Sequence, residues 1–573
     1  MSAATPHDRD HGAASGREER PERPEVEQDV APGSPLGSVV GGSLSEGVEI
    51  RLDGGASVED IFVGSYATIQ GDHKRFFGMV SEVRLGTTDA TLRATPPDVS
   101  DPIVARVFDG TVAYGSVTVR PRLVLPPVAG AGEGLTPART VPAHFSRAFR
   151  ASDADVAQVF GQEDDSHFVV GTPLDMETKV CLDLPRLVQR SNGVFGKSGT
   201  GKSFLTRLLL IGILQKTDAV SLVFDMHSEY GWQGDDVERG RRVKALRQLF
   251  GNRVAVFTMD EDHSRRRGVP FDEVVLLGMD EVEPEDIDVL AETMGITQAG
   301  VQAVYRLPGH LGRQWLRDFL AMESSADLSE LAEKLGEHPQ TVSALRRRLE
   351  RLKRMPFLAD QRAGKSLGRL LEHLDRGTHV VLEFGRHGGS LDAYMLVANI
   401  LTRRIHDRYR ERVEAAAGDG TKGPRNLVIV IEEAHRFLSP QVASQTIFGA
   451  IAREMRKYNV TLLVVDQRPG DIDREVMSQI GTKLCCLLDD ERDVAAVMEG
   501  AAGGRELRAV LAGLESRQQA LIFGDAVPIP VAIRTREYGS ESSYDALMRG
   551  QGRRRPTRRL AAPPADDEDD LFG

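Results

Sequence analysis

The chain has 573 residues, 40% of them hydrophobic, and a formal net charge of −13 at pH 7. This length exceeds what a single hydrophobic core usually organises, so we expect two or three domains with flanking tails. The negative charge argues against a protein that coats nucleic acid over its whole surface, although a local basic channel is compatible with it.

Membrane and secretion signals are missing from the sequence. No apolar run reaches the eighteen residues of a membrane span, and the N-terminus lacks the apolar core of a signal peptide. We therefore expect a cytoplasmic protein with no membrane partner. Cys181, Cys485 and Cys486 show neither metal-ligand spacing nor a disulfide framework, which predicts small buried apolar side chains in a reducing compartment.

The N-terminal part divides into three segments by composition. Residues 1–45 are rich in Pro, Gly and charge, which predicts a disordered tail. Residues 46–130 hold short apolar runs between turn residues, such as VEIRL, YATIQG and GSVTVRPRLVL. Runs of this length and spacing predict a small β-barrel or sandwich. We expect a linker over 131–164.

The rest of the chain is expected to be an α/β domain. Its continuous apolar strands lack a polar face, which is typical of a parallel sheet covered on both sides by helices. The expected parts are 165–280, a helical insertion at 281–376, a second core part at 377–537 and a disordered tail at 538–573. The expected strands are GVFG, AVSLVFD, RVAVFTMD, THVVLEFG, NLVIVIEE, TLLVVDQ, KLCCLLDD and QALIFGD.

The segment GKSGTGKS, residues 196–203, matches the phosphate-binding pattern G-x-x-x-x-G-K-[ST] between a strand and a helix. Its glycines let backbone N–H groups converge on phosphate oxygens at a helix N-terminus. We expect Lys202 to reach the β- and γ-phosphates and Ser203 to ligate Mg²⁺. An ordinary glycine loop is the competing interpretation, which motif and context together disfavour. The predicted ATP and Mg²⁺ site consists of Gly196, Lys197, Ser198, Gly199, Thr200, Gly201, Lys202 and Ser203.

An acidic strand end supplies the partners that such a loop needs. NLVIVIEEAHRF, residues 426–437, is an apolar strand that ends in Glu432 and Glu433. We expect Glu432 near the Mg²⁺ ion and Glu433 beside the attacking water. The competing interpretation is a strand capped by two solvated glutamates. Many P-loop enzymes have Asp where this chain has Glu, so the metal geometry stays open.

Two further strand ends carry candidate residues. Asp225 ends the strand of FDMHSEY, and Gln467 follows the strand of TLLVVDQRP, between Asp466 and Arg468. Each alone is equally well explained as a polar strand end. Because ligands of parallel sheets bind beyond the carboxyl ends of the strands, we expect these residues to face the phosphates together.

Three arginines are candidates for completing the site of a neighbouring subunit. In ring ATPases an arginine from one subunit can reach the γ-phosphate held by the next. Arg190 precedes the P-loop strand, and Arg453 and Arg456 lie in IAREMRKYN. The competing interpretation is that these side chains are only solvated.

These motifs, in this order, resemble the HerA family of the FtsK–HerA group of ring ATPases. The resemblance covers about 47–535 and includes an N-terminal segment, FFGMVSEVRLGTTDATLRATPP, that is similar to the barrel of that family. The family commonly has Gly at Ser228 and Met455 and Ser at Asp466, which concerns loop geometry rather than the nucleotide site. The matching ATPase segments are RSNGVFGKSGTGKSFLTRLLL, FDMHSEY, VIEEAH, IAREMRKYN and VVDQRPGDIDREVMSQIGTKL.

The resemblance implies a RecA-like P-loop ATPase that forms a homohexamer and moves double-stranded DNA through its centre. In the family the motor typically works with a NurA-like nuclease in DNA-end processing, and some relatives serve antiphage systems beside another effector enzyme. It implies phosphate and Mg²⁺ roles for Lys202 and Ser203 and a catalytic-base role for Glu433. Functional residues are implied at Asp225, Gln467, Arg190, Arg453 and Arg456.

Other segments have open interpretations. LSELAEKLGEHPQTVSALRRRLERL, residues 328–352, resembles a DNA-binding helix-turn-helix, although a helical subdomain with solvated arginines is favoured. HGGS (387–390) and SPQVASQ (439–445) are candidate channel loops. The C-terminal DDEDDLFG, after an Arg-rich patch, is either a partner-docking segment, a competitor of DNA for the channel or a solubilising tail.

The sequence therefore leads to an ATP-driven hexameric double-stranded DNA translocase or helicase that works in DNA-end processing and recombinational repair. The alternative is a nucleotide-gated ring scaffold that activates an effector enzyme in antiphage defence. A conjugative or secretion motor is disfavoured because the sequence has no membrane-spanning segment.

Overall fold

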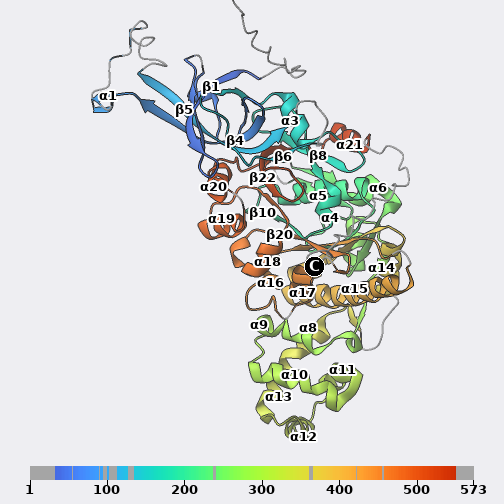
Figure 1. Cartoon of the computed structure of the whole chain (residues 1–573). Helices are drawn as coiled ribbons and strands as arrows, with labels where there is room; N and C mark the ends of the chain where they lie inside the picture. Colours follow the sequence, from blue (N-terminus) through green and yellow to red (C-terminus); the bar gives the residue numbers. More distant parts are fainter. Residues whose placement is uncertain are drawn as a thin grey trace, which may run out of the picture.

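The computed structural model shows three parts arranged along an elongated molecule (Figure 1). A β-barrel lies at one end, an α/β core in the middle and a group of helices at the other end. The structure describes residues 33–549 except 55, 90, 95–97, 99, 102–111, 127–133, 237–239, 360–365, 421–422, 445, 455–456 and 502. The predicted tail residues 1–32 and the Arg-rich and acidic C-terminal segments lie outside this part, as do Met455 and Arg456.

The N-terminal strands close into a barrel, which decides between the two architectures that the sequence allowed. The strand order is β2-β1-β7-β3-β4-β5-β6, and pairing of β2 with β5 closes the circuit. Ile50, Val117 and Ala148 are fully buried inside it. The strands are β1 (Pro35–Ser43), β2 (Gly47–Leu52), β3 (Tyr66–Gln70), β4 (Arg75–Thr87), β5 (Ala113–Leu125), β6 (Thr136–Pro137) and β7 (Arg147–Arg150), with the short helix α1 (Thr91–Ala94) after β4.

Several segments predicted to be tail or linker are ordered elements. β1 lies within the predicted tail 1–45, and β7 and helix α3 (Asp153–Phe160) lie within the predicted linker 131–164. Helix α21 (Glu541–Met548) lies within the predicted C-terminal tail, where Tyr544 and Leu547 are buried. These predictions were wrong because β1 and β7 are too Gly-rich or too short to show strand periodicity and gain order by pairing with each other.

The central sheet is mixed rather than wholly parallel. From β15 to β21 its order is β15-β14-β18-β11-β19-β20-β10-β21, and these neighbours pair in parallel as expected. The sheet then continues antiparallel through β22, β23, β8 and β9, so the expectation of a parallel strand at QALIFGD was wrong. A buried strand has the same apolar composition in either direction, so its connections decide its orientation.

The strands of the core begin with β8 (His167–Pro173), β9 (Val180–Asp183), β10 (Asn192–Phe195), β11 (Val220–Asp225), β14 (Val254–Thr258) and β15 (Glu273–Val274). They continue with β18 (His379–Glu383), β19 (Leu427–Glu432), β20 (Val460–Asp466), β21 (Thr482–Cys485), β22 (Gln519–Gly524) and β23 (Val531–Thr535). Two small pairs stand apart: β12 (Gln233–Asp236) with β13 (Arg241–Lys244), and β16 (Leu277–Gly278) with β17 (Leu358–Ala359).

Helix α5, which follows the P-loop, is buried on every side along its middle, from Leu205 to Leu214. An all-round apolar helix belongs in a protein interior, so the loop before it has a rigid support. Helix α5 spans Lys202–Lys216. The other core helices are α4 (Leu184–Val188), α6 (Leu246–Phe250), α7 (Glu261–Arg267), α15 (Leu391–Asp419), α16 (His435–Leu438), α17 (Ile447–Glu454), α18 (Arg474–Gln479), α19 (Glu491–Met498) and α20 (Gly504–Ala512).

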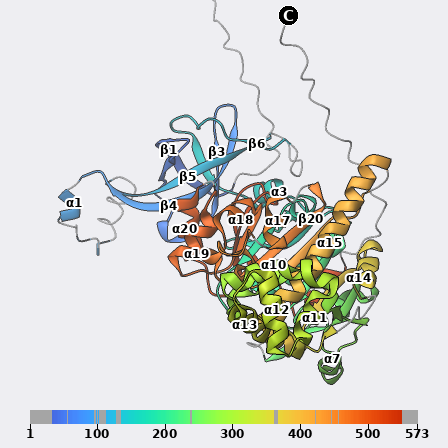
Figure 2. The same cartoon turned by 90° about the horizontal axis from the view of Figure 1, so that it is seen from below.

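The predicted insertion forms a helical group whose buried side chains, among them Trp315 and Phe319, are continuous with the core of the ATPase domain. Figure 2 shows α10 to α13 gathered together. Asp286 joins this group to the ATPase core through Arg403 and Asn399, each at 2.8 Å. Its helices are α8 (Pro284–Asp288), α9 (Ala291–Met294), α10 (Gln298–Leu311), α11 (Trp315–Ala321), α12 (Ser325–Leu335) and α13 (Pro339–Leu349), followed by α14 (Ser366–Asp375) near the core.

Basic side chains of the helix-turn-helix-like segment take part in intramolecular packing. Arg346 and Lys353 both donate to the carbonyl of Leu320, at 3.2 and 2.9 Å, and Arg351 pairs with Asp392 of α15. These contacts fit a helical subdomain, but Arg346 and Arg351 are bonded within the chain instead of being only solvated, as that interpretation had expected.

Two expectations from composition can be compared with the structure. Cys181, Cys485 and Cys486 are free and buried, which confirms their prediction as small interior side chains. Within the described ranges, no helix combines the length and the apolar character needed to cross a bilayer.

The junction between barrel and ATPase core contains a carboxylate shared by two arginines. Glu506 of α20 lies 2.6 Å from Arg120 and 3.5 Å from Arg122, both on barrel strand β5. Burial lowers the pKa of Arg122, and its partner Glu506 opposes this effect. Loss of Glu506 would leave two partly buried cations side by side.

We therefore expect Glu506→Ala to lower the free energy of unfolding by about 1–3 kcal/mol, measured by urea denaturation. Glu82→Ala is the matched control, because Glu82 pairs with Arg84 on the exposed part of β4. An exposed pair contributes little, so the control should change stability by less than about 0.5 kcal/mol. Equal effects of the two substitutions would show that the junction pairs add no stability.

Candidate nucleotide site

The P-loop connects β10 to α5 through a backbone that requires glycine. Gly199 and Gly201 have φ values of +78° and +98°, and Gly201 is the N-cap of α5. L-residues rarely adopt this left-handed region, whereas glycine enters it freely. The resulting turn directs the first N–H groups of α5 out of the helix end, where they favour an anion. The structure thus has the loop geometry that the motif predicts.

A cavity of about 640 Å³ lies against this loop. Lys202 lines it, and its Nζ donates to the carbonyl of Lys197 at 3.0 Å. Burial lowers the pKa of Lys202, so a bound anion would stabilise its charged form. The lining includes Ser198, Gly199, Thr200, Gly201, Lys202 and Ser203, whereas Gly196 and Lys197 lie outside it.

Glu432 closes one side of the cavity from the end of β19. Its Oε1 accepts a hydrogen bond from the Tyr230 hydroxyl at 3.0 Å. Its Oε2 is buried, with no hydrogen-bond partner among the described residues. Burial, with a contribution from Asp225, raises the pKa of Glu432 to about 8. A buried oxygen with no donor fits a cation ligand, because Mg²⁺ prefers carboxylate oxygens and would stabilise the ionised form.

Glu433 also lines the cavity, in a strained backbone conformation. Its φ is +49°, which is uncommon for a residue other than glycine and typical of functional sites. The Nε2 atom of Gln467 donates to its Oε1 at 2.6 Å. The structure therefore brings Glu432, Glu433 and Gln467 together beside the P-loop, as expected from the strand ends.

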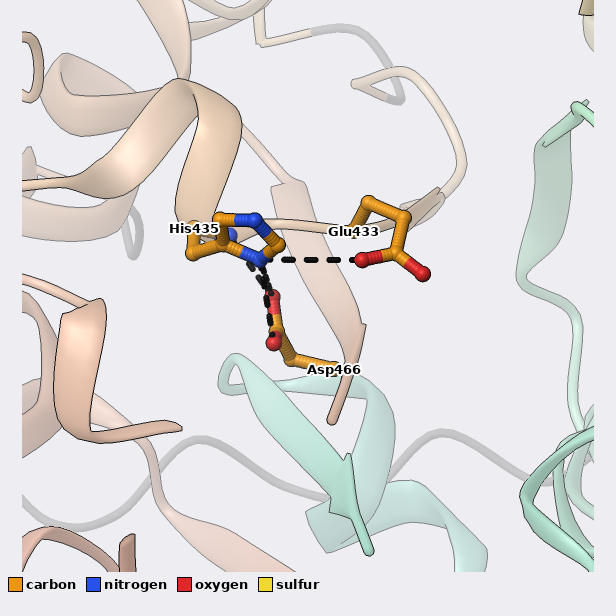
Figure 3. A group of neighbouring side chains, drawn as sticks. All are labelled: Glu433, His435 and Asp466. Atoms are coloured by element: carbon orange, nitrogen blue, oxygen red, sulfur yellow. Dashed lines mark hydrogen bonds and ion pairs between the residues drawn. The ribbon is translucent and has the colours of Figure 1, made fainter. Parts of the chain in front are cut away.

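The sequence analysis assigned no role to His435, which lies next to Glu433 (Figure 3). Its Nδ1 lies 3.0 Å from Oδ2 of Asp466 and 3.7 Å from Oε2 of Glu433. Asp466 is almost fully buried and also lines the cavity. The histidine was visible in the VIEEAH motif, but its contact with Asp466 joins two strand ends that lie far apart in sequence.

Asp225 does not face the cavity, contrary to expectation. It is fully buried and accepts backbone hydrogen bonds from Glu229, Tyr230 and Gly231 at 2.8, 2.8 and 3.3 Å. The carboxylate therefore stabilises the loop after β11 by binding its backbone N–H groups, and it does not face the cavity. His227 and Glu229 of that loop line the cavity in its place.

The fully buried Arg207 of α5 holds this loop from the other side. Its Nε donates to the carbonyl of Glu229 at 3.0 Å, and its guanidinium lies over the rings of Phe204 and Tyr230. Sequence reasoning missed Arg207 because a buried arginine inside an apolar helix has no local signature.

Two of the candidate arginines, Arg190 and Arg453, do not line the cavity of their own chain. Arg190 pairs with Asp525 at 2.9 Å, and Arg453 pairs with Glu475 at 3.1 Å. Neither lines the cavity, and Arg456 lies outside the described residues. A role for these side chains in a neighbouring subunit stays a prediction.

Part of the cavity lining comes from segments that the sequence analysis did not single out. Residues 517–519, where β22 begins, and residues 535–538, where β23 ends, line the cavity. Tyr538 packs edge-on against Phe204, with ring centroids 5.9 Å apart. No local motif marks these residues, because they reach the cavity only through the antiparallel extension of the sheet.

The candidate channel loop HGGS packs at the ends of β14 and β18. Arg386, just before it, binds Asp260 through its guanidinium at 2.7 Å, and this contact lowers the pKa of Asp260. A side chain on Gly388 would collide with the backbone of Met226. Whether HGGS or SPQVASQ faces a channel stays a prediction.

Comparisons with known proteins agree with this arrangement. A family model described as the central domain of helicase HerA matches residues 168–405, and the HAS barrel domain model matches residues 36–102. The chain belongs to the HerA family. It is accordingly a P-loop ATPase of RecA-like fold with an N-terminal HAS barrel. The acidic strand end and Gln467 lie beyond the residues matched by the HerA model.

Similar curated proteins include two named DNA double-strand break repair helicase HerA. The one from Pyrococcus furiosus is 22% identical, over 70% of this chain and 75% of its own length. The one from Saccharolobus solfataricus is 32% identical, over 29% of this chain and 32% of its own length.

Solved structures of similar fold include VirB4 of Thermoanaerobacter pseudethanolicus, at 15% identity and a TM-score of 0.42, covering 67% of this chain and 99% of that one. The plasmid coupling protein TrwB in complex with ADP and Mg²⁺ has 12% identity and a TM-score of 0.43, covering 69% of this chain and 94% of that one. At these identities and TM-scores, the properties of VirB4 and TrwB are not assigned to the HerA-family chain.

The loop after β11 offers a test of backbone strain. Ser228 has a φ of +56°, at the position where the HerA resemblance leads us to expect glycine. Backbone strain in this region lowers the stability of the folded state by about 1–2 kcal/mol for an L-residue. Glycine avoids this strain, but it lowers stability by up to about 1 kcal/mol because it gives the unfolded chain more freedom.

We expect Ser228→Gly to raise the free energy of unfolding by up to about 1 kcal/mol, measured by urea denaturation. Ser228→Ala is the matched control, since alanine keeps the strain and should give no gain. If glycine lowers stability relative to serine, the strain at this position is not real.

A second acidic pair lies buried below the cavity. Asp225 and Glu383 end the neighbouring parallel strands β11 and β18, where they are paired in register. Asp225 receives three backbone N–H groups, whereas both oxygens of Glu383 are buried without a hydrogen-bond partner among the described residues, and its Oε2 lies 3.8 Å from the guanidinium of Arg267. Burial and the charge of Asp225 raise the pKa of Glu383 to about 8. The proton of the pair therefore belongs on Glu383.

We expect the stability of the protein to fall as the pH rises from about 5 to 8, because folded Glu383 holds a proton that the unfolded chain releases near its ordinary pKa of 4.5. The contribution of one such group has a slope of at most about 1.4 kcal/mol per pH unit. Glu383→Gln should flatten this decline, measured by urea denaturation at pH 5, 6, 7 and 8. An unchanged pH profile would place the proton elsewhere.

Proposed function

We propose that this HerA-family ATPase uses ATP hydrolysis to move double-stranded DNA through the centre of a homohexameric ring. The observation that carries the proposal is the meeting of the P-loop, Glu432, Glu433 and Gln467 around one cavity. The relatives from Pyrococcus furiosus and Saccharolobus solfataricus are named as DNA repair helicases, which supports DNA as the substrate.

The P-loop residues would hold the nucleotide phosphates. Lys202 would bind the β- and γ-phosphates, and the N–H groups of the loop would bind their oxygens. Ser203 and Glu432 would hold Mg²⁺, because the Oε2 of this cavity-lining glutamate has no hydrogen-bond partner among the described residues and so fits a cation. When bound, Mg²⁺ would neutralise charge on the phosphates.

Glu433 would act on the attacking water. Its carboxylate would accept a proton as the water oxygen bonds to the γ-phosphorus, while the bond to the bridging oxygen breaks and its electron pair leaves with ADP. Gln467, which donates to Glu433 at 2.6 Å, is placed to contact the γ-phosphate or this water.

We further propose a cytoplasmic location and work beside a NurA-like nuclease at DNA ends. Arg190, Arg453 or Arg456 would then act on the site of the next subunit, since an arginine supplied in trans completes many ring ATPase sites. Sequence-independent contacts to the DNA backbone suit a motor that must move along any duplex.

We expect Lys202→Ala to abolish tight ATP binding and Glu433→Gln to bind ATP while losing at least about 100-fold in kcat. The measurement is steady-state Mg²⁺-ATPase activity of the full chain, with binding of a fluorescent ATP analogue. Glu541→Gln is the matched control, because its exposed carboxylate lies at α21 and pairs with Lys244 away from Glu433. Normal turnover of either site variant would contradict the corresponding assignment.

The same assay tests the DNA substrate. Linear duplex should stimulate hydrolysis in the wild type but not in Glu433→Gln, and a preference for linear over circular duplex would indicate loading at ends. Hydrolysis that ignores every DNA would contradict the proposed motor while leaving the ATPase activity intact.

A further inference from the structure

The groups behind Glu433 form a connected set that the proposed reaction does not yet use. We propose that Asp466 and His435 are a positioning dyad that holds the carboxylate of Glu433 in place for hydrolysis. This inference rests on the proposed role of Glu433 as the group that accepts the proton of water.

Asp466 is the fixed point of the dyad. It ends β20, is 1% exposed, and accepts the backbone N–H groups of His435 and Arg468, both at 2.6 Å. These two N–H groups belong to the first residue of helix α16, which follows β19, and to the loop after the neighbouring parallel strand β20. One buried carboxylate therefore ties both segments together and places their side chains relative to each other.

His435 is oriented by the same carboxylate. Its Nδ1 faces both oxygens of Asp466, at 3.2 and 3.0 Å, so the hydrogen bond assigns its ring proton to Nδ1. The same nitrogen lies 3.7 Å from Oε2 of Glu433, as Figure 3 shows. The polar edge of the ring thus separates two carboxylates that would otherwise repel each other across the gap.

Glu433 consequently has a hydrogen-bond donor on one side and, on the other, a polar ring edge that lies beyond hydrogen-bond distance. Gln467 donates to its Oε1, and the Nδ1 edge of His435 faces its Oε2. The left-handed backbone at Glu433 is the third constraint. A base that is oriented by a second group, itself oriented by a third, recurs among activated catalytic sites. Misplacing a catalytic group by about 1 Å can reduce a rate by about 100-fold, so orientation of this carboxylate would affect kcat.

A metal ion is the competing interpretation of this cluster, because ligand atoms of Glu433, His435 and Asp466 lie within 4.8 Å of one another. Each oxygen of Asp466 already accepts a short backbone hydrogen bond, and Nδ1 of His435 is engaged with the same carboxylate. A bound ion would have to compete with these bonds. The hydrogen-bonded dyad satisfies the same groups without an ion.

The test is a double-mutant cycle on the full chain with saturating linear duplex and Mg²⁺. We expect His435→Ala to lower kcat by about 10- to 100-fold, with the KM for ATP and binding of a fluorescent ATP analogue within about twofold of wild type. In a Glu433→Gln background, where residual single-turnover rates are measured, His435→Ala should have less than about a twofold effect. Arg436→Ala, at the exposed neighbour, is the control and should keep wild-type kcat.

A conservative pair of variants separates positioning from folding. The amide nitrogen of His435→Asn can replace Nδ1 and should restore kcat to within about fivefold of wild type, whereas the longer side chain of His435→Gln should not. Thermal unfolding of all variants identifies any that fail to fold, and the Asn-to-Gln comparison still decides the question if His435→Ala is among them.

The outcomes are distinct. Equal losses from His435→Ala in both backgrounds would overturn the dyad, because His435 would then act independently of Glu433. Wild-type kcat in His435→Ala with an inactive Glu433→Gln would also overturn it while leaving the proposed function standing. A stoichiometric transition-metal ion in the wild type, lost in His435→Ala, would replace the dyad with a metal site. Normal turnover of Glu433→Gln would instead overturn the proposed role of Glu433.

Discussion

The parallel alignment of β10, β20 and β19 is the constraint on which the nucleotide site depends. In register, Phe195 lies beside Asp466, and Glu432 lies beside Val465. The residues that follow these strands must therefore emerge at one edge of the sheet. This brings the P-loop, the two glutamates and Gln467 to the same cavity, although they span most of the ATPase core in sequence.

Convergence of strand ends also concentrates carboxylates, and the protein accommodates each one differently. Asp225 accepts three backbone N–H groups, Asp466 accepts two and a histidine, and Glu383 holds a proton through its raised pKa. Glu432, like Glu383, keeps buried oxygen without a hydrogen-bond partner among the described residues, but of the two only Glu432 lines the cavity. Buried charge is costly unless it is paired or neutralised, so the unsatisfied carboxylate at the cavity is the one placed to meet a cation.

Sequence patterns predicted those parts of the fold and of the site that depend on the chemistry of neighbouring residues in the chain. The P-loop needs glycines and a lysine at fixed spacing, and buried strands need continuous apolar runs, so both were predictable. Patterns failed where long-range pairing supplies the order, as in β1, β7 and α21. They also failed at Asp225, because three nearby backbone N–H groups bind its carboxylate and keep it out of the cavity lining.

The sequence by itself determined the P-loop, the acidic strand end, the α/β class and the HerA resemblance, because each is written in contiguous residues. Only the tertiary structure decided the antiparallel end of the sheet, the cavity wall at 517–519 and 535–538, and the placement of His435 between Asp466 and Glu433. These features depend on which strands become neighbours. Which strands become neighbours depends on packing and on the connections across the whole core, and a short segment of sequence does not contain that information.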